Sequence, residues 1–528
     1  MDKNKSLLGG ESKDKPFYIT TSIAYTNAKP HVGHAYEAIL TDVIARYQRS
    51  AGREVFFLTG TDEHGSKILR KAKEEGVSTQ AFVNEISDFF KELYKKLLIS
   101  NDGFIRTSDK KNHWPGAQKL WEKIVESGDL YKKNYKGLYC VGCEGFITEK
   151  ELVNGLCSLH GKAPEVVEEE NYFFRLSKYA KILEEKISSG ELTVLPESRK
   201  NEALSFIKDG LEDISFSRPE ASVPWGVPVP GDSSHMMYVW CDALSNYISA
   251  VGYGRDDKQF ESIWPADAHV VGKDILRFHA VFWPAMLLSA GVPLPKRILV
   301  HGFILSEGKK MSKSVGNVID PEEYINEYGE EAFRFFMAKE IPPFEDGDFT
   351  KQKFIDSYNG NLANGLGNLL SRTVAMAEKY FEGNVVPHNP ESVPLVKKFK
   401  SPIGGEVVEG YGVSYAIEQE IIPKYTECME EFRIHHALDI VFSLIKELDG
   451  YISDYEPFKL IKEDKEKAED VIWNVLYGLL VVGDLIAPVM PETSLVIKET
   501  ITGDIKSDAP VAFSVKPLAK PLFARILK

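Results

Sequence analysis

Cysteine and long apolar runs are both scarce in these 528 residues. Only five cysteines are present, too few for the dense disulfide framework of small secreted domains. The late stretch 475–490 is apolar, but Gly483, Asp484 and Pro488 interrupt it. A membrane-spanning helix needs about 20 apolar residues. These shortages argue against a disulfide-rich secreted protein and against a membrane protein.

Positive charge is also in short supply. The chain has 64 Lys and Arg against 78 Asp and Glu, a net charge of −14, which argues against binding nucleic acid through overall charge. A nucleic-acid partner would need a local basic strip. Residues 1–15 are polar, with no signal-peptide pattern, so we expect a mobile tail and a cytoplasmic protein. At about 150 residues per domain, the length predicts three or four domains.

Residues 17–48 predict a strand, a turn and a helix. A β-prone run at 17–21 precedes the turn, which holds His31, Gly33 and His34. The start of a helix presents N–H groups and the positive end of its dipole, which suits a phosphate. Two histidines in a polar turn are the alternative interpretation. The following apolar residues recur at helical spacing: Ala35, Ile39, Val43, Ile44 and Tyr47.

A second candidate phosphate-binding pattern lies far downstream. The string Lys310-Met311-Ser312-Lys313-Ser314 follows a strand-like run at 297–300 and a polar loop at 305–309. Two lysines beside small hydroxyl residues could close over a triphosphate and stabilise the departing pyrophosphate. A solvated basic loop is the alternative.

Three of the five cysteines share one short segment with a histidine. Two residues separate Cys140 from Cys143, and Cys157 and His160 follow further along the segment. Three thiolates and one imidazole complete a closed, tetrahedral zinc site. No ligand position is left for a substrate, so the pattern predicts one structural Zn²⁺.

The H-x-G-H and K-M-S-K-S strings resemble the two signatures of class I aminoacyl-tRNA synthetases. The flanking sequence, from about residue 16 to the end, resembles the methionyl-tRNA synthetases, of the type with a single zinc knuckle and without an appended C-terminal tRNA-binding domain. This resemblance implies an α/β protein: a split Rossmann-type parallel sheet with a zinc-bearing insertion, then an all-α anticodon-binding bundle. The expected limits are a tail at 1–15, catalytic halves at 16–112 and 236–310, the insertion at 113–235, the KMSKS loop and stem-contact region at 311–350, and the helical domain at 351–528.

The resemblance implies a two-step reaction. L-Methionine and ATP give methionyl-adenylate, and the methionyl group passes to the 3′ end of tRNA(Met), the initiator included. We expect a monomer that uses Mg²⁺ with ATP and has no membrane partner. The expected catalytic residues are His31, His34, Lys310 and Lys313, and Gly33 and Ser312 are also expected to bind ATP.

Asp62 follows an apolar run at 54–58, where ligands bind in open parallel sheets. A helix-capping aspartate is an equally good interpretation of the spacing. Trp240, Ala243, Leu244 and Tyr247 share one helix face, a stripe that is more often plain core. Leu244 replaces a proline that some family members carry. The resemblance assigns a methionine pocket to Ile23, Tyr25, Asp62, Trp240, Ala243, Leu244, Tyr247, Ile275 and His279.

Beyond residue 350, apolar residues recur at spacings of three and four in 350–381, 413–453 and 465–500, which predicts an α-bundle. The resemblance assigns anticodon binding to Asn368, Arg372 and Phe458. Phe458 stands where many members have Trp, so it can stack on a base but lacks the indole donor. A core aromatic is the alternative. Segment 383–412 fits the family poorly and predicts no function.

Three alternative functions are a catalytically silent tRNA-binding paralogue, a small-molecule nucleotidyltransferase with H-x-G-H, and a cysteinyl-type synthetase. The intact signatures argue against the first. A zinc knuckle followed by a helical bundle argues against the second. In the third, zinc would bind the substrate thiol, whereas four protein ligands are expected here.

Overall fold

A seven-stranded parallel sheet forms the centre of the catalytic half. The computed structural model describes residues 15–142, 144–147, 149, 152–158, 161–311, 317–395, 412–503, 505 and 511–527. The strand order is β10-β16-β15-β1-β3-β2, with β4 also paired to β3. The strands are β1 (Phe17–Thr21), β2 (Ala24–Tyr25), β3 (Val55–Asp62), β4 (Gly103–Arg106), β10 (Thr193–Leu195), β15 (Ala268–Gly272) and β16 (Arg297–His301). The predicted Rossmann-like sheet is confirmed.

Helices cover both faces of this sheet. Alternate residues of a strand point to opposite faces, so Phe17 and Ile19 pack with α1 while Tyr18 joins a separate apolar cluster on the other side. The predicted apolar stripe of α1 is buried. The helices of this half are α1 (Val32–Ser50), α2 (Ser66–Glu74), α3 (Thr79–Lys96), α4 (Trp114–Glu126), α5 (Ala180–Ser189), α6 (Glu197–Lys208), α7 (Val239–Leu244), α8 (Asn246–Ser249), α9 (Asp257–Ile263) and α10 (Trp283–Ser289).

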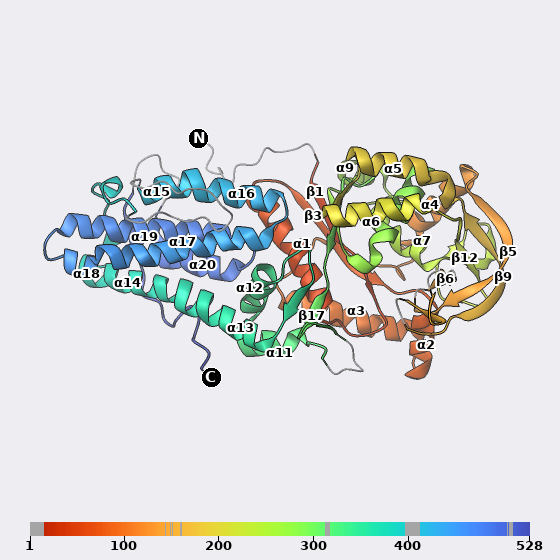
Figure 1. Ribbon diagram of the computed structural model, residues 1–528, viewed down its shortest axis with the longest axis horizontal. Coiled ribbons are helices and arrows are strands. Elements are labelled where there is room, and N and C mark those ends of the chain that lie inside the picture. Colours follow the sequence, from red (N-terminus) through yellow and green to blue (C-terminus); the bar gives the residue numbers. More distant parts are fainter. Residues whose placement is uncertain are drawn as a thin grey trace.

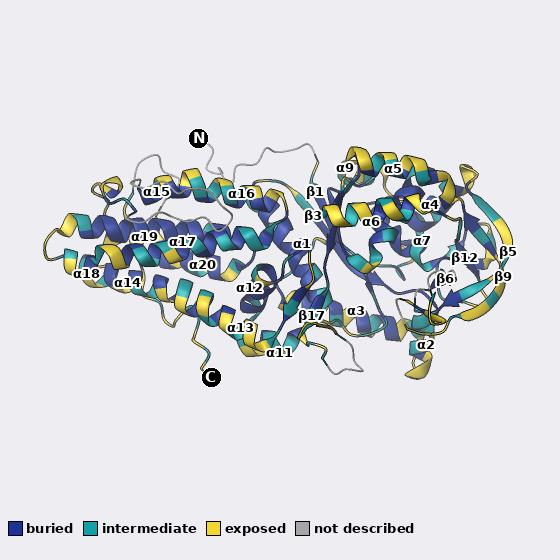
Figure 2. Ribbon diagram, in the orientation of Figure 1, coloured by how far each residue is buried: buried dark blue, intermediate teal, exposed yellow. Residues whose placement is uncertain are grey.

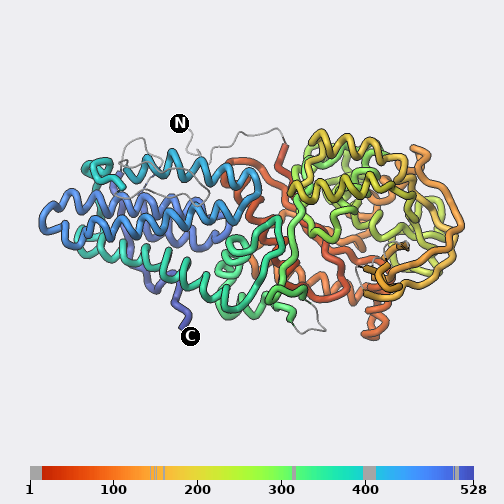
Figure 3. Tube along the Cα trace, in the orientation of Figure 1, coloured from red at the N-terminus to blue at the C-terminus, as the bar shows by residue number. Residues whose placement is uncertain are grey.

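The expected insertion contains a long antiparallel ribbon. It lies at the end of the molecule opposite the helical bundle (Figures 1 and 3). The ribbon consists of β5 (Leu130–Cys140) and β9 (Glu165–Phe174), flanked by β6 (Gly145–Ile147) and β11 (Ile214–Ser215). Smaller strands follow: β7 (Leu152–Val153), β8 (Leu156–Cys157), β12 (Ser217–Pro219), β13 (Pro228–Val229) and β14 (Asp232–Met237).

One strand corrects the expectation that the sheet is built only from residues before 113 and after 235. β10 lies inside that span, yet it pairs parallel with β16 in the central sheet. Val194 is buried there between sheet and helices. The insertion therefore returns to the catalytic sheet and supplies its edge strand before continuing.

The C-terminal part is the predicted helical bundle. Figure 2 shows α17 and α19 mostly buried. The helices are α11 (Pro321–Tyr328), α12 (Glu330–Glu340), α13 (Lys351–Ser357), α14 (Asn368–Phe381), α15 (Val413–Ala416), α16 (Ile422–Glu430), α17 (Ile434–Tyr455), α18 (Pro457–Leu460), α19 (Lys465–Ile486) and α20 (Pro491–Thr500), with π-helical stretches at Tyr358–Gly367 and Ile417–Ile421. Short strands complete the chain: β17 (Ile304–Ser306), β18 (Lys309–Lys310), β19 (Gly347–Phe349), β20 (Asn384–Val385), β21 (Ile501–Thr502) and β22 (Phe513–Val515).

Part of segment 383–412 is fastened to the start of α19. The backbone N–H of His388 and that of Asn389 donate to the two carboxylate oxygens of Asp470, each at 2.8 Å. Residues 396–411 lie outside the described residues. Within the part of the chain that the structure describes, none of the helices has the length and apolar character needed to pass through a membrane.

Candidate active site

The H-x-G-H turn forms the N-terminal cap of α1. His31 Nδ1 accepts a hydrogen bond from the Gly33 N–H at 3.1 Å, and His34 Nδ1 accepts one from the His31 N–H at 3.2 Å. A neutral ring that accepts at Nδ1 carries its proton at Nε2. Burial, and then the neighbouring His31, hold the pKa of His34 well below its usual range. His34 is therefore a neutral Nε2–H donor near pH 7.

Gly33 allows the His31 ring, which lies beside that of His34, to approach the backbone. The centroids of the two rings are 3.9 Å apart. A Cβ at position 33 would lie 3.0 Å from Cε1 of His31, tighter than ordinary side-chain contact. The glycine therefore permits the position of the His31 ring at the helix start.

Glu37, one turn further along α1, ties the start of the helix to two strand ends. Its Oε2 lies 2.9 Å from Nε2 of His301 at the end of β16, and its Oε1 accepts from Ser22 N and Oγ at 2.9 and 2.6 Å. Burial disfavours a charged His301, but the hydrogen bond and charge of Glu37 outweigh it and raise the pKa of His301. Neither residue was predicted from the sequence, because nothing in the local pattern links positions 37 and 301.

Four of the expected methionine-pocket residues come together beside β15. The Tyr247 hydroxyl lies 2.8 Å from His279 Nε2, and His279 Nδ1 lies 3.0 Å from the Ile275 carbonyl. The ring therefore donates from Nδ1 and accepts at Nε2. Burial lowers the pKa of His279 to about 4, so this wall of the pocket is uncharged near pH 7. Trp240 stacks on Phe278 with ring centroids 3.7 Å apart, and Phe278 was not predicted.

The expected single helix around Trp240 is two short helices, α7 and α8, that meet at Ser245. Ala243 and Leu244 are both buried. The Tyr247 carbonyl also accepts a hydrogen bond from the Tyr18 hydroxyl, at 2.7 Å.

Asp62 ends β3 and is only 8% exposed. Burial, followed by the charge of nearby Asp242, raises the pKa of Asp62 well above its usual value. A carboxyl group in this setting is stabilised in its charged form by any cation that binds beside it. The capping alternative is wrong for α2: the cap of that helix is Gly65, which forms no side-chain cap bond.

Glu144 connects the insertion to Tyr25 and α2. Its carboxylate accepts from the Tyr25 hydroxyl at 2.9 Å, from the Lys67 N–H at 2.7 Å and from the Ser66 hydroxyl at 2.9 Å. It thus accepts a hydrogen bond from the Lys67 N–H, one of the N-terminal N–H groups that α2 leaves open. Ile23, just before Tyr25, is half-buried against the same core as Trp240.

Two of the four expected zinc ligands lie in the described structure. Cys140 and Cys157 are buried in one small cluster with Ile147. Cys143 and His160 lie outside the described residues. Among the residues that are described, no group of three His, Cys, Asp or Glu side chains is arranged so that it could hold a metal ion. The two thiols present fit the expected donor set.

Lys310 is exposed on β18, with Nζ 5.3 Å from the centroid of the Phe303 ring. Ser312 and Lys313 lie outside the described residues. β18 pairs with β17, the strand pair that follows β16. The chain therefore runs from the carboxyl end of β16, where His301 lies, through β17 and β18 to the KMSKS string.

The expected anticodon residues lie on α14 and α18. Asn368 is exposed, and Arg372 Nη2 lies 3.2 Å from Oδ1 of Asp449 on α17. Phe458 is 43% exposed, so the alternative that it is a buried core aromatic is wrong. α17 leads almost directly into α18, which places Phe458 at the same end of α17 as Asp449.

Comparison with known proteins extends these observations. The family model for "tRNA synthetases class I (M)" matches residues 17–157 and 147–374. The methionine–tRNA ligase of Clostridium acetobutylicum is 44% identical over 491 residues, covering 92% of this chain and 73% of the relative. That of Thermotoga maritima is 42% identical over 483 residues, covering 90% and 74%.

Solved structures agree with this match. Mycobacterium tuberculosis methionyl-tRNA synthetase in complex with methionyl-adenylate is 37% identical, with a TM-score of 0.88, over 97% of this chain and 100% of the other. Its apo form gives 34% and 0.83 over 97% and 99%. Because the similarity runs through the sheet, the insertion and the bundle alike, the chain belongs to the methionyl-tRNA synthetases of class I.

Proposed function

We propose that the chain joins L-methionine to tRNA(Met), the initiator included, through methionyl-adenylate formed at the carboxyl edge of the central sheet. The observation that carries this proposal is that three features follow strands at that edge: the His31–His34 turn, the buried Asp62 and the aromatic pocket around Tyr247 and His279. The matched relatives are methionine–tRNA ligases.

The first step needs no general base, because the methionine carboxylate is already a nucleophile. Its oxygen forms a bond to the α-phosphorus of ATP, and the bond from that phosphorus to the pyrophosphate oxygen breaks. The protein contributes alignment and charge stabilisation. We assign the Nε2–H donors of His31 and His34, with the backbone at Gly33, to the phosphates. Lys310, Ser312 and Lys313 would hold the departing pyrophosphate. Mg²⁺, when bound, neutralises phosphate charge.

In the second step a ribose hydroxyl of the tRNA 3′ end attacks the methionyl carbonyl, and AMP leaves. We assign the substrate ammonium to Asp62, whose raised pKa would fall once a cation binds. The thioether would lie among aromatic and apolar groups, where each sulfur–ring contact contributes about 0.3–1.5 kcal/mol. The proposed pocket residues are Ile23, Tyr25, Trp240, Ala243, Leu244, Tyr247, Ile275 and His279.

The remaining assignments are proposals of the same kind. One structural Zn²⁺ would be held by Cys140, Cys143, Cys157 and His160. Asn368, Arg372 and Phe458 would contact the anticodon, and the exposure of Phe458 supports this role. We further propose a monomeric cytoplasmic enzyme whose domains follow the expected limits, with β10 assigned to the catalytic sheet.

The test separates the phosphate role from the methionine role. His34→Ala should lower the rate of adenylate formation about 10²- to 10³-fold, as expected for loss of one preorganised donor, and leave the Kd for methionine nearly unchanged. Asp62→Asn should instead raise the Kd for methionine. If His34→Ala abolishes methionine binding while the chemical step survives, the phosphate assignment is wrong.

A further inference from the structure

Arg334 is a fully buried arginine that joins four segments of the chain. It lies on α12 with 0% of its surface exposed. Nε donates to the Val489 carbonyl at 2.8 Å, Nη1 to the Leu97 carbonyl at 2.9 Å, and Nη2 to the Pro488 carbonyl at 3.0 Å. Nη2 also lies 2.7 Å from Oδ2 of Asp42 on α1. A planar guanidinium holds such a set in fixed directions, which lysine does not.

Asp42, the anionic partner, is itself buried and fully bonded. Its Oδ1 accepts from the Ser100 N–H at 2.7 Å and from the Ser100 hydroxyl at 2.5 Å, and its Oδ2 accepts from Arg46 Nε at 2.8 Å. Burial favours the neutral acid, but the charges of Arg334 and then Arg46 outweigh it, and the pKa of Asp42 is lowered. The ion pair is therefore charged on both sides.

A second charged side chain of α12, the acidic Glu331, binds the same connection between α19 and α20. Glu331 accepts from the Glu492 N–H at 2.6 Å and the Thr493 N–H at 2.8 Å at the start of α20. Arg334 binds the carbonyls that follow α19. The charge of Glu331 thus matches the positive end of the dipole of α20. α19, with 22 residues, is about 33 Å long at 1.5 Å per residue and packs against α18 at its other end.

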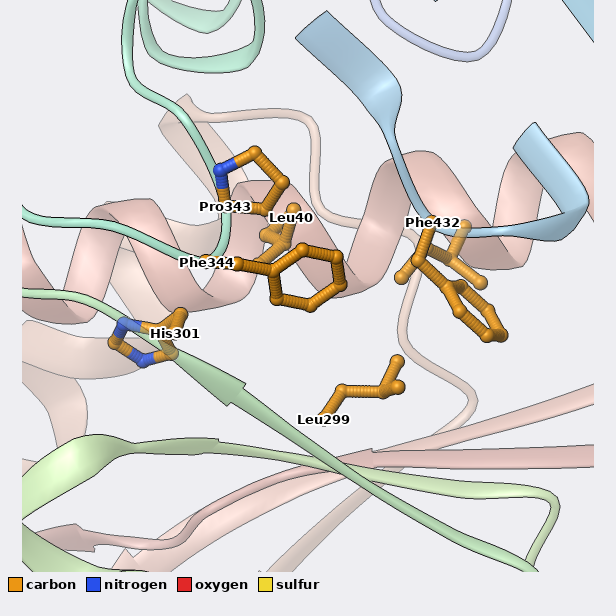
Figure 4. Close-up of a pocket in the computed structure, with 7 residues that line it drawn as sticks. Leu40, Leu299, His301, Pro343, Phe344 and Phe432 are labelled. Atoms are coloured by element: carbon orange, nitrogen blue, oxygen red, sulfur yellow. The ribbon is translucent and has the colours of Figure 1, made fainter. Parts of the chain in front are cut away.

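Apolar packing leaves a gap on the side of α1 that carries Leu40 and Ile44. Figure 4 shows this pocket between α1, β16 and the helical bundle, lined by Leu40, Ile44, Leu299, His301, Pro343, Phe344 and Phe432. Two further polar contacts of α1 flank it, from the Tyr36 hydroxyl to the Pro342 carbonyl at 3.2 Å and from the Tyr47 hydroxyl to Glu430 at 3.1 Å. The buried Asp42–Arg334 pair stabilises the other side of α1, because Asp42 lies two residues, about 200° around the helix, from Leu40 and from Ile44.

We propose that Arg334 is a positioning residue for adenylate formation: by holding Asp42, it fixes α1 against the helical half and so fixes His31 and His34. Asp42 lies eight residues beyond His34, about 12 Å along a continuous helix, so a shift of α1 at Asp42 moves the turn as well. A misplacement of 1 Å can cost about 10²-fold in rate. This inference rests on the proposed phosphate role of the turn.

The experiment compares Arg334→Met, Arg334→Lys and Asp42→Asn with Glu331→Gln as the matched control, because all the hydrogen bonds given above for Glu331 go to α20. Arg334→Met and Asp42→Asn each remove one charge of the ion pair. We expect both to lower the kcat of methionine-dependent ATP–pyrophosphate exchange about ten- to a hundredfold, with the KM for methionine nearly unchanged. Arg334→Lys keeps the positive charge but lacks the planar guanidinium, so its kcat should lie between those of these variants and the wild type. Glu331→Gln should lower the melting temperature and keep kcat.

A double variant, Asp42→Leu with Arg334→Met, keeps the inference testable if a single variant fails to fold, since replacing a buried ion pair by apolar residues is often tolerated. We expect it to fold and to remain slow. Wild-type kcat in a folded double variant, or equal kcat losses in Glu331→Gln and Arg334→Met, would overturn the positioning role. If instead His34→Ala retains full exchange, it is the proposed phosphate role that fails.

Discussion

Oδ2 of Asp242 lies 2.6 Å from Nδ1 of His64, and its other oxygen lies 2.6 Å from Nε2 of His113. All three side chains are buried, and the Ser249 hydroxyl lies 2.9 Å from the remaining nitrogen of His113. Burial would raise the pKa of Asp242, but His64 and His113 outweigh it and lower this pKa to about 2. Asp242 is thus a permanent anion, and its charge contributes to the raised pKa of Asp62. The pKa values of Asp62 and Asp242, two neighbouring carboxyl groups, are therefore shifted in opposite directions, as at many active sites.

Asp242→Asn should destabilise the fold by about 3–5 kcal/mol, because it removes one partner of a buried charged network. It should also let Asp62 ionise more readily. The measurement is denaturant unfolding at pH 7. Asp257→Asn is the matched control, since its pair with Lys119 is largely exposed and contributes at most about 1 kcal/mol. Equal stability losses in the two variants would show that the network has no special role.

His279 predicts a pH dependence of stability between about pH 6.5 and 4. Its folded pKa is lowered to about 4, below the unfolded value of about 6.5. The unfolded chain therefore binds more protons in this window. The contribution of His279 to the free energy of unfolding is complete above pH 6.5 and declines as the pH falls toward 4, by roughly 3 kcal/mol. His279→Gln should flatten the curve by this amount. Because His269 is also buried with a lowered pKa, only the difference between variant and wild type tests the assignment, and parallel curves would contradict it.

We predict one zinc ion per chain, which Cys140→Ser combined with Cys157→Ser should abolish. Metal analysis of the purified protein measures this, and Cys428→Ser is the control because that buried thiol lies on α16. Since Glu144 joins this segment to Tyr25, loss of zinc should also weaken methionine binding. Protein that contains no zinc, or that retains it in the double variant, would rule out the site.

Phe458→Ala should raise the KM for tRNA(Met) about ten- to a hundredfold, because an aromatic–base stack contributes about 1–3 kcal/mol. The melting temperature should change little, since the side chain is 43% exposed. Phe458→Trp should retain or improve charging. Leu495→Ala, at another exposed apolar position, is the control. An unchanged KM for tRNA, with normal discrimination against anticodon-altered tRNA, would remove Phe458 from the anticodon surface.

Local patterns predicted the elements well and their long-range partners poorly. The H-x-G-H turn, the stripe of α1 and the bundle follow from motif and periodicity, and all are present. β10 was missed because three residues between two helices give no strand signal. Asp242 and His113 are 129 positions apart, and Arg334 reaches carbonyls more than 150 positions away. Such pairs arise from the tertiary fold and leave no trace in local sequence.

The most direct test is amino-acid-dependent ATP–pyrophosphate exchange by the purified chain, with each of the twenty amino acids in turn. Methionine alone should support rapid exchange, because the uncharged Tyr247–His279 wall and the buried Asp62 suit an α-amino acid with an apolar, polarisable side chain. His34→Ala, measured in parallel, should reduce that exchange. Exchange that is absent with methionine, or faster with cysteine or any other amino acid, would contradict the proposed function.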